Sequence, residues 1–273
     1  MAILHDYHMH SSFSTDSTAS MESMIQSAID KNLKGICITE HYDIDYPNYN
    51  GESSPMFLVD FEAYLSKYQE LAAKYQGKLD FAFGLELGLQ PHLANTYYDC
   101  LRKYPFDFII GSIHTCNGHD PYYPEFYFKD IEEEEAYRNY FKFILDNLSV
   151  YDGFDSLGHL DYVVRYGPNK DKFYTYEKYK DLLDPILMKL VSMGKAIECN
   201  AGALSRGLKT TNPNSTILRR YRELGGELVT IGSDAHKPEA IGADFDFARA
   251  ILLESGFKHY ATFRERKPQV HKL

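Results

Sequence analysis

The sequence has no tryptophan, only four cysteines, no long apolar run and fewer basic than acidic residues. The cysteines show no Cys-x-x-Cys spacing, which argues against a disulfide framework. No apolar run approaches the roughly 18 residues that cross a bilayer, and the first residues lack the pattern of a signal peptide. The net charge is −10 and no basic cluster is present. We therefore expect no membrane partner, no nucleic-acid partner and a cytoplasmic location.

What the chain does have is a regular alternation of short apolar runs, rich in β-branched and aromatic residues, with longer amphipathic stretches. The apolar runs span residues 4–9, 35–39, 79–87, 108–113, 156–160, 196–199 and 228–231. The amphipathic stretches span residues 20–31, 60–75, 91–104, 131–148, 176–193, 216–224 and 245–254, with Ser20, Asp60 and Ser215 at N-cap positions. Strand-then-helix units without a dividing linker predict an α/β fold with a parallel sheet closed into a TIM-like barrel, as one domain over residues 1–273.

Histidines and acids gather where the predicted strands end. Ligands of parallel α/β folds collect at these carboxyl ends. Residues i and i+2 of an extended chain share a face, so His8 with His10, and Asp234 with His236, can point the same way. The other strand ends carry His41, Glu86, His114 and His159.

Histidines and acids recur at the ends of several separate predicted strands, which chance placement would not produce. Histidine with carboxylate and without cysteine is typical of catalytic transition-metal sites, and so many ligands need more than one metal. Several divalent metals together favour hydrolysis of a phosphate ester.

Six motifs in order resemble those of the polymerase-and-histidinol-phosphatase (PHP) superfamily. They are His8-x-His10, Ile38-Thr39-Glu40-His41, Gly84-x-Glu86, Gly111-Ser112-Ile113-His114, Gly158-His159-Leu160-Asp161 and Gly232-Ser233-Asp234-Ala235-His236. The segments 6–11, 106–114 and 159–162 look most like its histidinol-phosphate phosphatase branch.

The resemblance implies a distorted (βα)7 barrel that holds three divalent metal ions, whether Zn, Mn or Fe. The first metal would bind His8, His10, Glu86 and Asp234; the second Glu86, His114 and His159; the third Asp16, His41 and His236. Glu86, Asp234 and His41 form the predicted catalytic set. The implied reaction, in histidine biosynthesis, is hydrolysis of L-histidinol phosphate to L-histidinol and phosphate, by in-line attack of a metal-bridging hydroxide.

Substrate contacts are predicted outside the metal ligands. Three divalent metals, set against Asp16, Glu86, Asp234 and one hydroxide, leave about two positive charges to meet a phosphate dianion. Arg165 and Arg206 follow predicted strands and can bind phosphate oxygens with their planar guanidinium groups, and Asn200 is a further candidate. The substrate amine and imidazole would meet the loops 40–57 and 114–130. The acids available there are Glu40, Asp43, Asp45, Glu52 and Asp120, among which the sequence does not choose.

Two other functions use the same ligands. One is a PHP-type nuclease or a phosphoesterase acting on another ester, which the acidic charge and the absence of tryptophan disfavour. The other is a non-catalytic metal-storage or regulatory protein. The sequence leaves the metal identity and the oligomeric state open.

Overall fold

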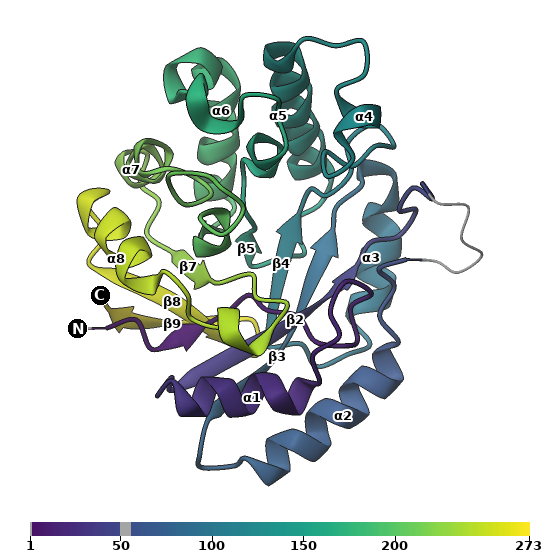
Figure 1. The fold of residues 1–273 in the computed structure, drawn as a ribbon, viewed down its shortest axis with the longest axis vertical. Helices are drawn as coiled ribbons and strands as arrows, with labels where there is room; N and C mark the ends of the chain where they lie inside the picture. Colours follow the sequence, from purple (N-terminus) through teal and green to yellow (C-terminus); the bar gives the residue numbers. More distant parts are fainter. Residues whose placement is uncertain (1, 50–55) are drawn as a thin grey trace.

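The chain forms a parallel sheet of seven strands in sequence order, β1 to β7, curled into a nearly closed barrel with helices around its outside (Figure 1). The computed structural model describes residues 2–49 and 56–273. The first and last strands approach each other, because the Tyr7 amide donates to the Ile231 carbonyl (3.0 Å) and the Asp234 amide donates to the His8 carbonyl (2.8 Å). The predicted (βα)7 barrel is therefore confirmed.

Each predicted strand and each predicted amphipathic helix is present. The strands are β1 (His5–Asp6), β2 (Gly35–Tyr42), β3 (Asp80–Gly88), β4 (Phe108–Ser112), β5 (Ser156–Leu157), β6 (Ala196–Asn200) and β7 (Val229–Gly232). The matching helices are α1 (Met21–Asp30), α2 (Phe61–Lys74), α3 (Ala94–Leu101), α5 (Glu133–Val150), α6 (Tyr176–Ser192), α7 (Ser215–Glu223) and α8 (Phe245–Glu254). Short 3-10 helices cover Pro91–Leu93, Tyr162–Arg165, Lys170–Lys172, Ala201–Ala203 and Pro238–Ala240.

The helix starts follow ordinary capping chemistry, with one correction. Ser20 accepts from the Ser23 amide and Asp60 accepts from two amides of the first turn of α2, as predicted. The predicted cap Ser215 is wrong: it is the first helical residue, and the preceding Asn214 accepts from the Thr216 and Ile217 amides. Both residue types cap well, so the spacing alone could not separate them. No helix in the described residues is long and apolar enough to span a membrane.

Besides the short 3-10 helices, three elements were not predicted: the helix α4 (Pro124–Tyr127) and the two strands of a C-terminal hairpin, β8 (His259–Arg264) and β9 (Lys267–Lys272). The hairpin lies beside β1, where both chain ends meet in Figure 1. Arg264 donates to the Phe81 carbonyl and to Asp107, just before β4 begins, and the Phe263 ring stacks on Phe108 at 5.1 Å. The hairpin thus covers the barrel end where the strands start, which leaves the opposite end for the site.

A buried histidine joins this hairpin to the first strand. His5 Nδ1 lies 2.6 Å from the Tyr260 hydroxyl, and its ring lies 4.2 Å from that of His271. Burial, together with the neighbouring His271, lowers the pKa of His5 to about 4. The folded protein therefore keeps His5 neutral at pH values where the unfolded chain protonates it.

We predict that burial of His5 makes the folded protein less stable in acid. Because the folded pKa lies below the ordinary value of 6.5, stability falls as the pH drops from 6.5 towards 4. His5→Gln, neutral throughout, should lose less stability over this range, so the melting temperature of the wild type should fall relative to the variant. Thermal unfolding at fixed metal content measures this, with the exposed His259→Gln as control. A pH-independent difference between wild type and His5→Gln would contradict the prediction.

Candidate metal centre

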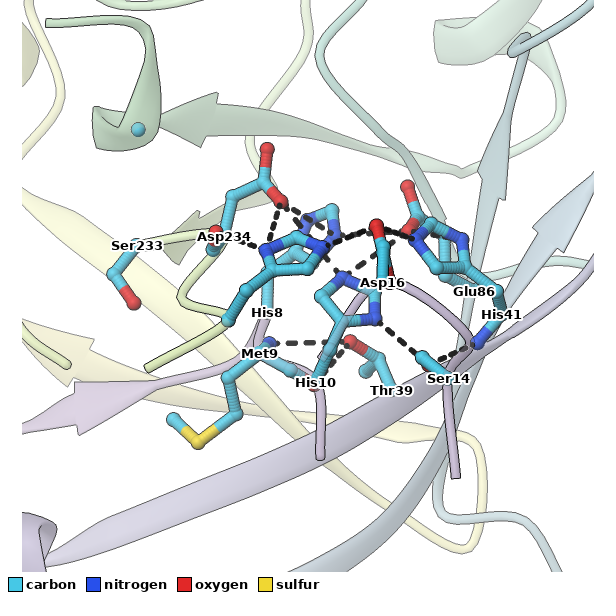
Figure 2. Close-up of polar contacts among 12 residues, drawn as sticks. His8, Met9, His10, Ser14, Asp16, Thr39, His41, Glu86, Ser233 and Asp234 are labelled. Carbon is cyan, nitrogen blue, oxygen red and sulfur yellow. Dashed lines mark hydrogen bonds and ion pairs between the residues drawn. The ribbon is translucent and has the colours of Figure 1, made fainter. Parts of the chain in front are cut away.

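The open end of the barrel collects the residues that the sequence analysis placed at strand ends. Glu86 lies near the end of β3 and His41 near the end of β2, and the strand register pairs these two positions. His8 and His10 follow β1, and Figure 2 shows their rings with Asp16, His41, Glu86 and Asp234 around one centre. His114 follows β4, His159 follows β5, and Asp234 and His236 follow β7.

Glu86 is the hub of this cluster and is fully buried. Its Oε1 lies 3.1 Å from His114 Nε2 and 2.9 Å from His159 Nε2. Its Oε2 lies 3.2 Å from His8 Nε2, 3.4 Å from His10 Nε2 and 3.2 Å from His41 Nδ1. Five imidazoles from four different strand ends therefore converge on one carboxylate, with Ser112 Oγ donating to Oε1 at 2.7 Å.

The donor atoms of this cluster fit bound cations. Several of its buried nitrogen and oxygen atoms lie close together without a hydrogen-bond partner, although such atoms are normally paired in proteins. They are His8 Nε2, His10 Nε2, His41 Nδ1 and Glu86 Oε2. Four groups of three residues place ligand atoms within 4.8 Å of one another: His10, His41 and His236; His8, Glu86 and His159; His8, His10 and Asp234; His41, Glu86 and His114. Shared members show a continuous multinuclear set of donors rather than separate pockets.

The buried carboxylates of the cluster also need positive charge beside them. Burial would raise the pKa of Glu86, but the surrounding imidazoles, His8 first, hold it well below its usual range. Conversely, burial opposes protonation of His41, but Glu86 and Asp16 raise its pKa to about 10. Protons on histidine thus compensate the carboxylates where no cation is bound, and cations of higher charge can replace them.

Asp16 reaches the cluster from the loop after β1. Its Oδ2 lies 2.9 Å from His236 Nε2 and 3.6 Å from His41 Nε2, and its side chain is 38% exposed, so it lies at the mouth of the site. The buried Glu40 holds this loop, because its carboxylate accepts from the Ser11 amide (3.1 Å) and from the hydroxyls of Ser11 and Ser14. Burial, partly offset by these bonds, raises the pKa of Glu40 to about 7.

Asp234 takes a conformation that the sequence analysis did not expect. The chain is not extended there: Asp234 has φ +56°, in the left-handed region that non-glycine residues rarely adopt. The turn nevertheless brings Asp234 Oδ1 within 3.9 Å of His8 Nε2 and 3.7 Å of His10 Nε2. It also leaves Asp234 Oδ2 facing away from those histidines, towards two arginines.

Both predicted phosphate-binding arginines lie at this second face of Asp234. Arg165 NH1 donates to Asp234 Oδ2 at 2.9 Å, and Arg206 NH2 lies 3.3 Å from the same oxygen. Both arginines line the cavity above the cluster. Asn200 accepts from Arg165 NH2 at 2.8 Å, but it is fully buried behind the arginine and does not line the cavity.

Two carboxylates lie behind cluster histidines: Glu198, which was not predicted as functional, and Asp43, which was predicted only as a possible contact of the substrate amine or imidazole. Glu198 Oε1 lies 2.6 Å from His8 Nδ1, and Asp43 Oδ1 lies 2.7 Å from His114 Nδ1. Each binds the ring nitrogen that points away from Glu86. Glu198 lies near the end of an apolar strand run, which is the same signal that identified Glu86, but the partner of each acid becomes visible only in three dimensions.

The cavity beyond the cluster has a volume of about 640 Å³, within the usual range of small-molecule sites. Its walls include Tyr46, Phe57, Asp120, Tyr162 and Tyr166. Of the acids left open by the sequence, Asp43 and Asp120 line this cavity, and Glu40 supports the loop below it. Asp45 pairs with His92 at the surface (3.0 Å), and Glu52 lies outside the described residues.

The comparisons with known proteins agree with this geometry. Residues 6–202 match the family model of the PHP domain. A histidinol-phosphatase of Lactococcus lactis subsp. lactis is 34% identical over 263 residues, which cover 96% of this chain and 95% of that protein. A protein of Clostridium acetobutylicum named a probable histidinol-phosphatase is 37% identical over 253 residues, with 93% and 94% coverage.

One similar protein is known with its ligands. The crystal structure of the Lactococcus lactis histidinol phosphate phosphatase, complexed with zinc, L-histidinol and phosphate, superposes with a TM-score of 0.87 at 31% identity. The match covers 98% of this chain and 99% of that one. The chain described here belongs to the PHP domain family.

Proposed function

We propose that the protein is a metal-dependent phosphatase that hydrolyses L-histidinol phosphate to L-histidinol and phosphate, a reaction of histidine biosynthesis. The observation that carries this proposal is the set of unpaired, buried imidazole and carboxylate atoms around Glu86, directly below two cavity-lining arginines. Relatives of 34% and 37% identity over most of the chain are named histidinol-phosphatases, which supports the same substrate. A cytoplasmic location stays a prediction.

The proposed metal ligands are those that the motifs suggested. They are His8, His10, Asp16, His41, Glu86, His114, His159, Asp234 and His236, with Glu86 shared between ions. When bound, divalent cations polarise phosphate oxygens, lower the pKa of a bound water and neutralise the departing alkoxide. Glu86, Asp234 and His41 remain the proposed catalytic set: Glu86 and His41 each belong to two donor groups, and Asp234 faces His8 and His10 on one side and the two arginines on the other.

The chain itself orients the phosphate. Arg165 is buried and donates to three acceptors. These are the side-chain oxygens of Asn212 (2.6 Å), Asn200 (2.8 Å) and Asp234 (2.9 Å). Arg206 shares the Asp234 carboxylate and is more exposed. Two guanidinium groups placed side by side can bind separate oxygens of a phosphate monoester and fix its orientation.

Asp120 offers a place for the amine of the substrate. It is 3% exposed, lines the cavity, and accepts from the hydroxyls of Tyr46 (2.6 Å) and Tyr162 (3.2 Å) and from the Tyr122 amide (2.8 Å). All three donors are neutral, and burial raises the pKa of Asp120 to about 6. A carboxylate buried in this way is stabilised by an incoming cation, such as the ammonium group of histidinol.

Tyr162 links this amine site to the phosphate site. Its hydroxyl contacts Asp120, while its ring lies 5.4 Å from the Arg165 guanidinium carbon and 5.0 Å from the His159 ring. A ligand that contacts both Asp120 and Arg165 would therefore cross an aromatic wall, which suits an imidazole or a short apolar chain. A nuclease substrate would instead need a basic surface, and the net charge is −10.

The direct test is phosphate release from L-histidinol phosphate by metal-analysed protein, with and without added Zn²⁺ or Mn²⁺. We expect turnover that disappears on chelation and returns with metal. Once the cations are removed, only protons compensate the charge of the buried carboxylates, and protons do not activate water or phosphate as divalent cations do. Faster hydrolysis of oligonucleotide ends would favour the nuclease alternative. No release with any divalent metal would favour a storage or regulatory protein.

Glu86→Gln tests the hub. The substitution keeps the shape but removes the charge that faces five imidazoles, so metal content and phosphate release should both fall. We expect a loss of more than about 100-fold in turnover, beyond the 10- to 100-fold typical for groups that only support a metal ligand. Elemental analysis and phosphate release measure it, with the exposed Glu125→Gln of α4 as control. Wild-type metal content with normal turnover in Glu86→Gln would refute the proposed ligand set.

Asp120→Asn tests recognition of the amine. We expect the KM for L-histidinol phosphate to rise roughly 10- to 100-fold, because a hydrogen bond to a charged group contributes about 1.5–3 kcal/mol. The KM for a phosphate monoester without an amine should stay unchanged. Asp130→Asn, at an exposed acid of the same loop region, is the matched control. An equal rise of KM for both substrates would show that Asp120 supports the fold of the cavity and does not select the amine.

A further inference from the structure

Glu198, the third residue of β6, lies between the metal cluster and the phosphate-binding arginine. It is 1% exposed, and both its oxygens are used. We infer that Glu198 is a positioning residue that orients two functional side chains at once: His8, for metal binding, and Arg165, through Asn200, for phosphate binding. The inference rests on the proposed function, but it concerns metal and phosphate affinity, which can be measured without turnover.

The first arm of this arrangement ends on His8. Glu198 Oε1 lies 2.6 Å from His8 Nδ1, a strong hydrogen bond that keeps the proton on Nδ1. His8 Nε2 is therefore the nitrogen left for a cation, and it faces Glu86 Oε2 at 3.2 Å. A carboxylate behind an imidazole fixes its tautomer and ring orientation and makes it a better metal ligand.

The second arm ends on Arg165. Glu198 Oε2 accepts from the Asn200 Nδ2 amide at 3.1 Å, and this contact turns Asn200 Oδ1 towards Arg165 NH2, 2.8 Å away. With the amide reversed, its NH2 group would face the guanidinium and two donors would meet. Glu198, and at a longer distance Asp234 Oδ2 (3.4 Å), accept from the Asn200 NH2 group, so Asn200 Oδ1 is left to hold Arg165 in the orientation in which Arg165 also contacts Asp234.

A third donor makes a carboxylate necessary at this position. The His159 main-chain amide donates to Glu198 Oε2 at 2.7 Å, so the group meets donors on both oxygens: His8 on one, and Asn200 and His159 on the other. A glutamine here must present its NH2 either to His8 Nδ1 or to the two amide donors. The first orientation makes His8 Nδ1 the acceptor and moves the ring proton to Nε2, the nitrogen that faces the cluster. The second places donor against donor, whereas a carboxylate accepts from all three.

The contact between Glu198 and His8 depends on the glycine at position 232. A methyl group on Gly232 of the neighbouring strand would lie 2.2 Å from His8 Cβ and 2.6 Å from Glu198 Oε1. The lack of a side chain at Gly232 thus lets His8 and Glu198 meet. Asp43 binds the outer nitrogen of another cluster histidine, His114, and within residues 2–49 and 56–273 no link from Asp43 to an arginine is seen.

Glu198→Gln is the main test, and both readouts are equilibrium measurements. In competition with a chromophoric chelator, the affinity for Zn²⁺ should fall 10- to 100-fold. At saturating Zn²⁺, the affinity for inorganic phosphate in calorimetry should fall about tenfold, the size expected when one charge-assisted hydrogen bond is misplaced. Asp155→Asn is the matched control: Asp155 is a buried carboxylate before β5 that contacts Arg266 and the Ile109 amide, far from the cluster in the hydrogen-bond network.

The control separates positioning from stability. Asp155→Asn should lower the melting temperature while leaving both affinities unchanged, and Glu198→Gln should lower both affinities even at temperatures where circular dichroism shows it fully folded. Glu198→Asp, which keeps the charge but withdraws it by one methylene, provides the same readout if Glu198→Gln does not fold. Wild-type affinity for both Zn²⁺ and phosphate in a folded Glu198 variant would overturn the inference.

Asn200→Ala tests the second arm alone. It leaves the contact between Glu198 and His8 in place, so phosphate affinity should fall about as much as in Glu198→Gln. Zn²⁺ affinity should stay at the wild-type value. Unchanged phosphate affinity, or an equal loss of Zn²⁺ affinity, would show that Asn200 does not connect Glu198 to Arg165. Absence of phosphate release from L-histidinol phosphate in the wild type, with both affinities intact, would instead count against the proposed function.

Discussion

The site depends on one buried carboxylate, Glu86, which five imidazole nitrogens approach within 3.4 Å. An isolated ionised carboxylate at zero exposure is costly, so the barrel end can exist only if positive charge surrounds this group. The histidines provide that charge either by being protonated or by binding metal cations. The strand ends, the loop that carries Asp16 and the left-handed turn at Asp234 all serve to bring donors to this one point.

Four more charged side chains surround the cluster of candidate metal ligands. Glu198 and Asp43 add two buried carboxylates behind the histidines, and Arg165 and Arg206 add two guanidinium groups around Asp234. These additions cancel, so the estimate of about two positive charges from three divalent cations, three ligand carboxylates and a hydroxide still holds with the full set of neighbours. An acidic protein can therefore present a cationic pocket to a phosphate monoester, while its acidic surface disfavours nucleic acid.

The two ends of the barrel have different tasks. At the end where the strands begin, the hairpin β8–β9 packs aromatic rings and pairs arginines with Asp107 and Asp155, which stabilises the fold. At the end where the strands finish, buried polar atoms remain unpaired and backbone strain is tolerated. Stability at one end permits such an arrangement at the other, because the net stability of a domain is small and strain must be offset elsewhere.

The sequence by itself determined the barrel and most of the candidate ligands. Alternating apolar runs and amphipathic stretches locate strands and helices, since side-chain periodicity is local, and parallel strands direct their ends to one face. Only the tertiary structure decided which acid serves which partner. Glu198 lies 190 residues from His8 and Asp43 lies 71 from His114, and Asp120, 3% exposed, accepts from the distant hydroxyls of Tyr46 and Tyr162. Such contacts join distant segments, so no local pattern records them. The conformation of Asp234 and the hairpin over the barrel base follow the same rule, because strain and edge packing are set by neighbours that only folding supplies.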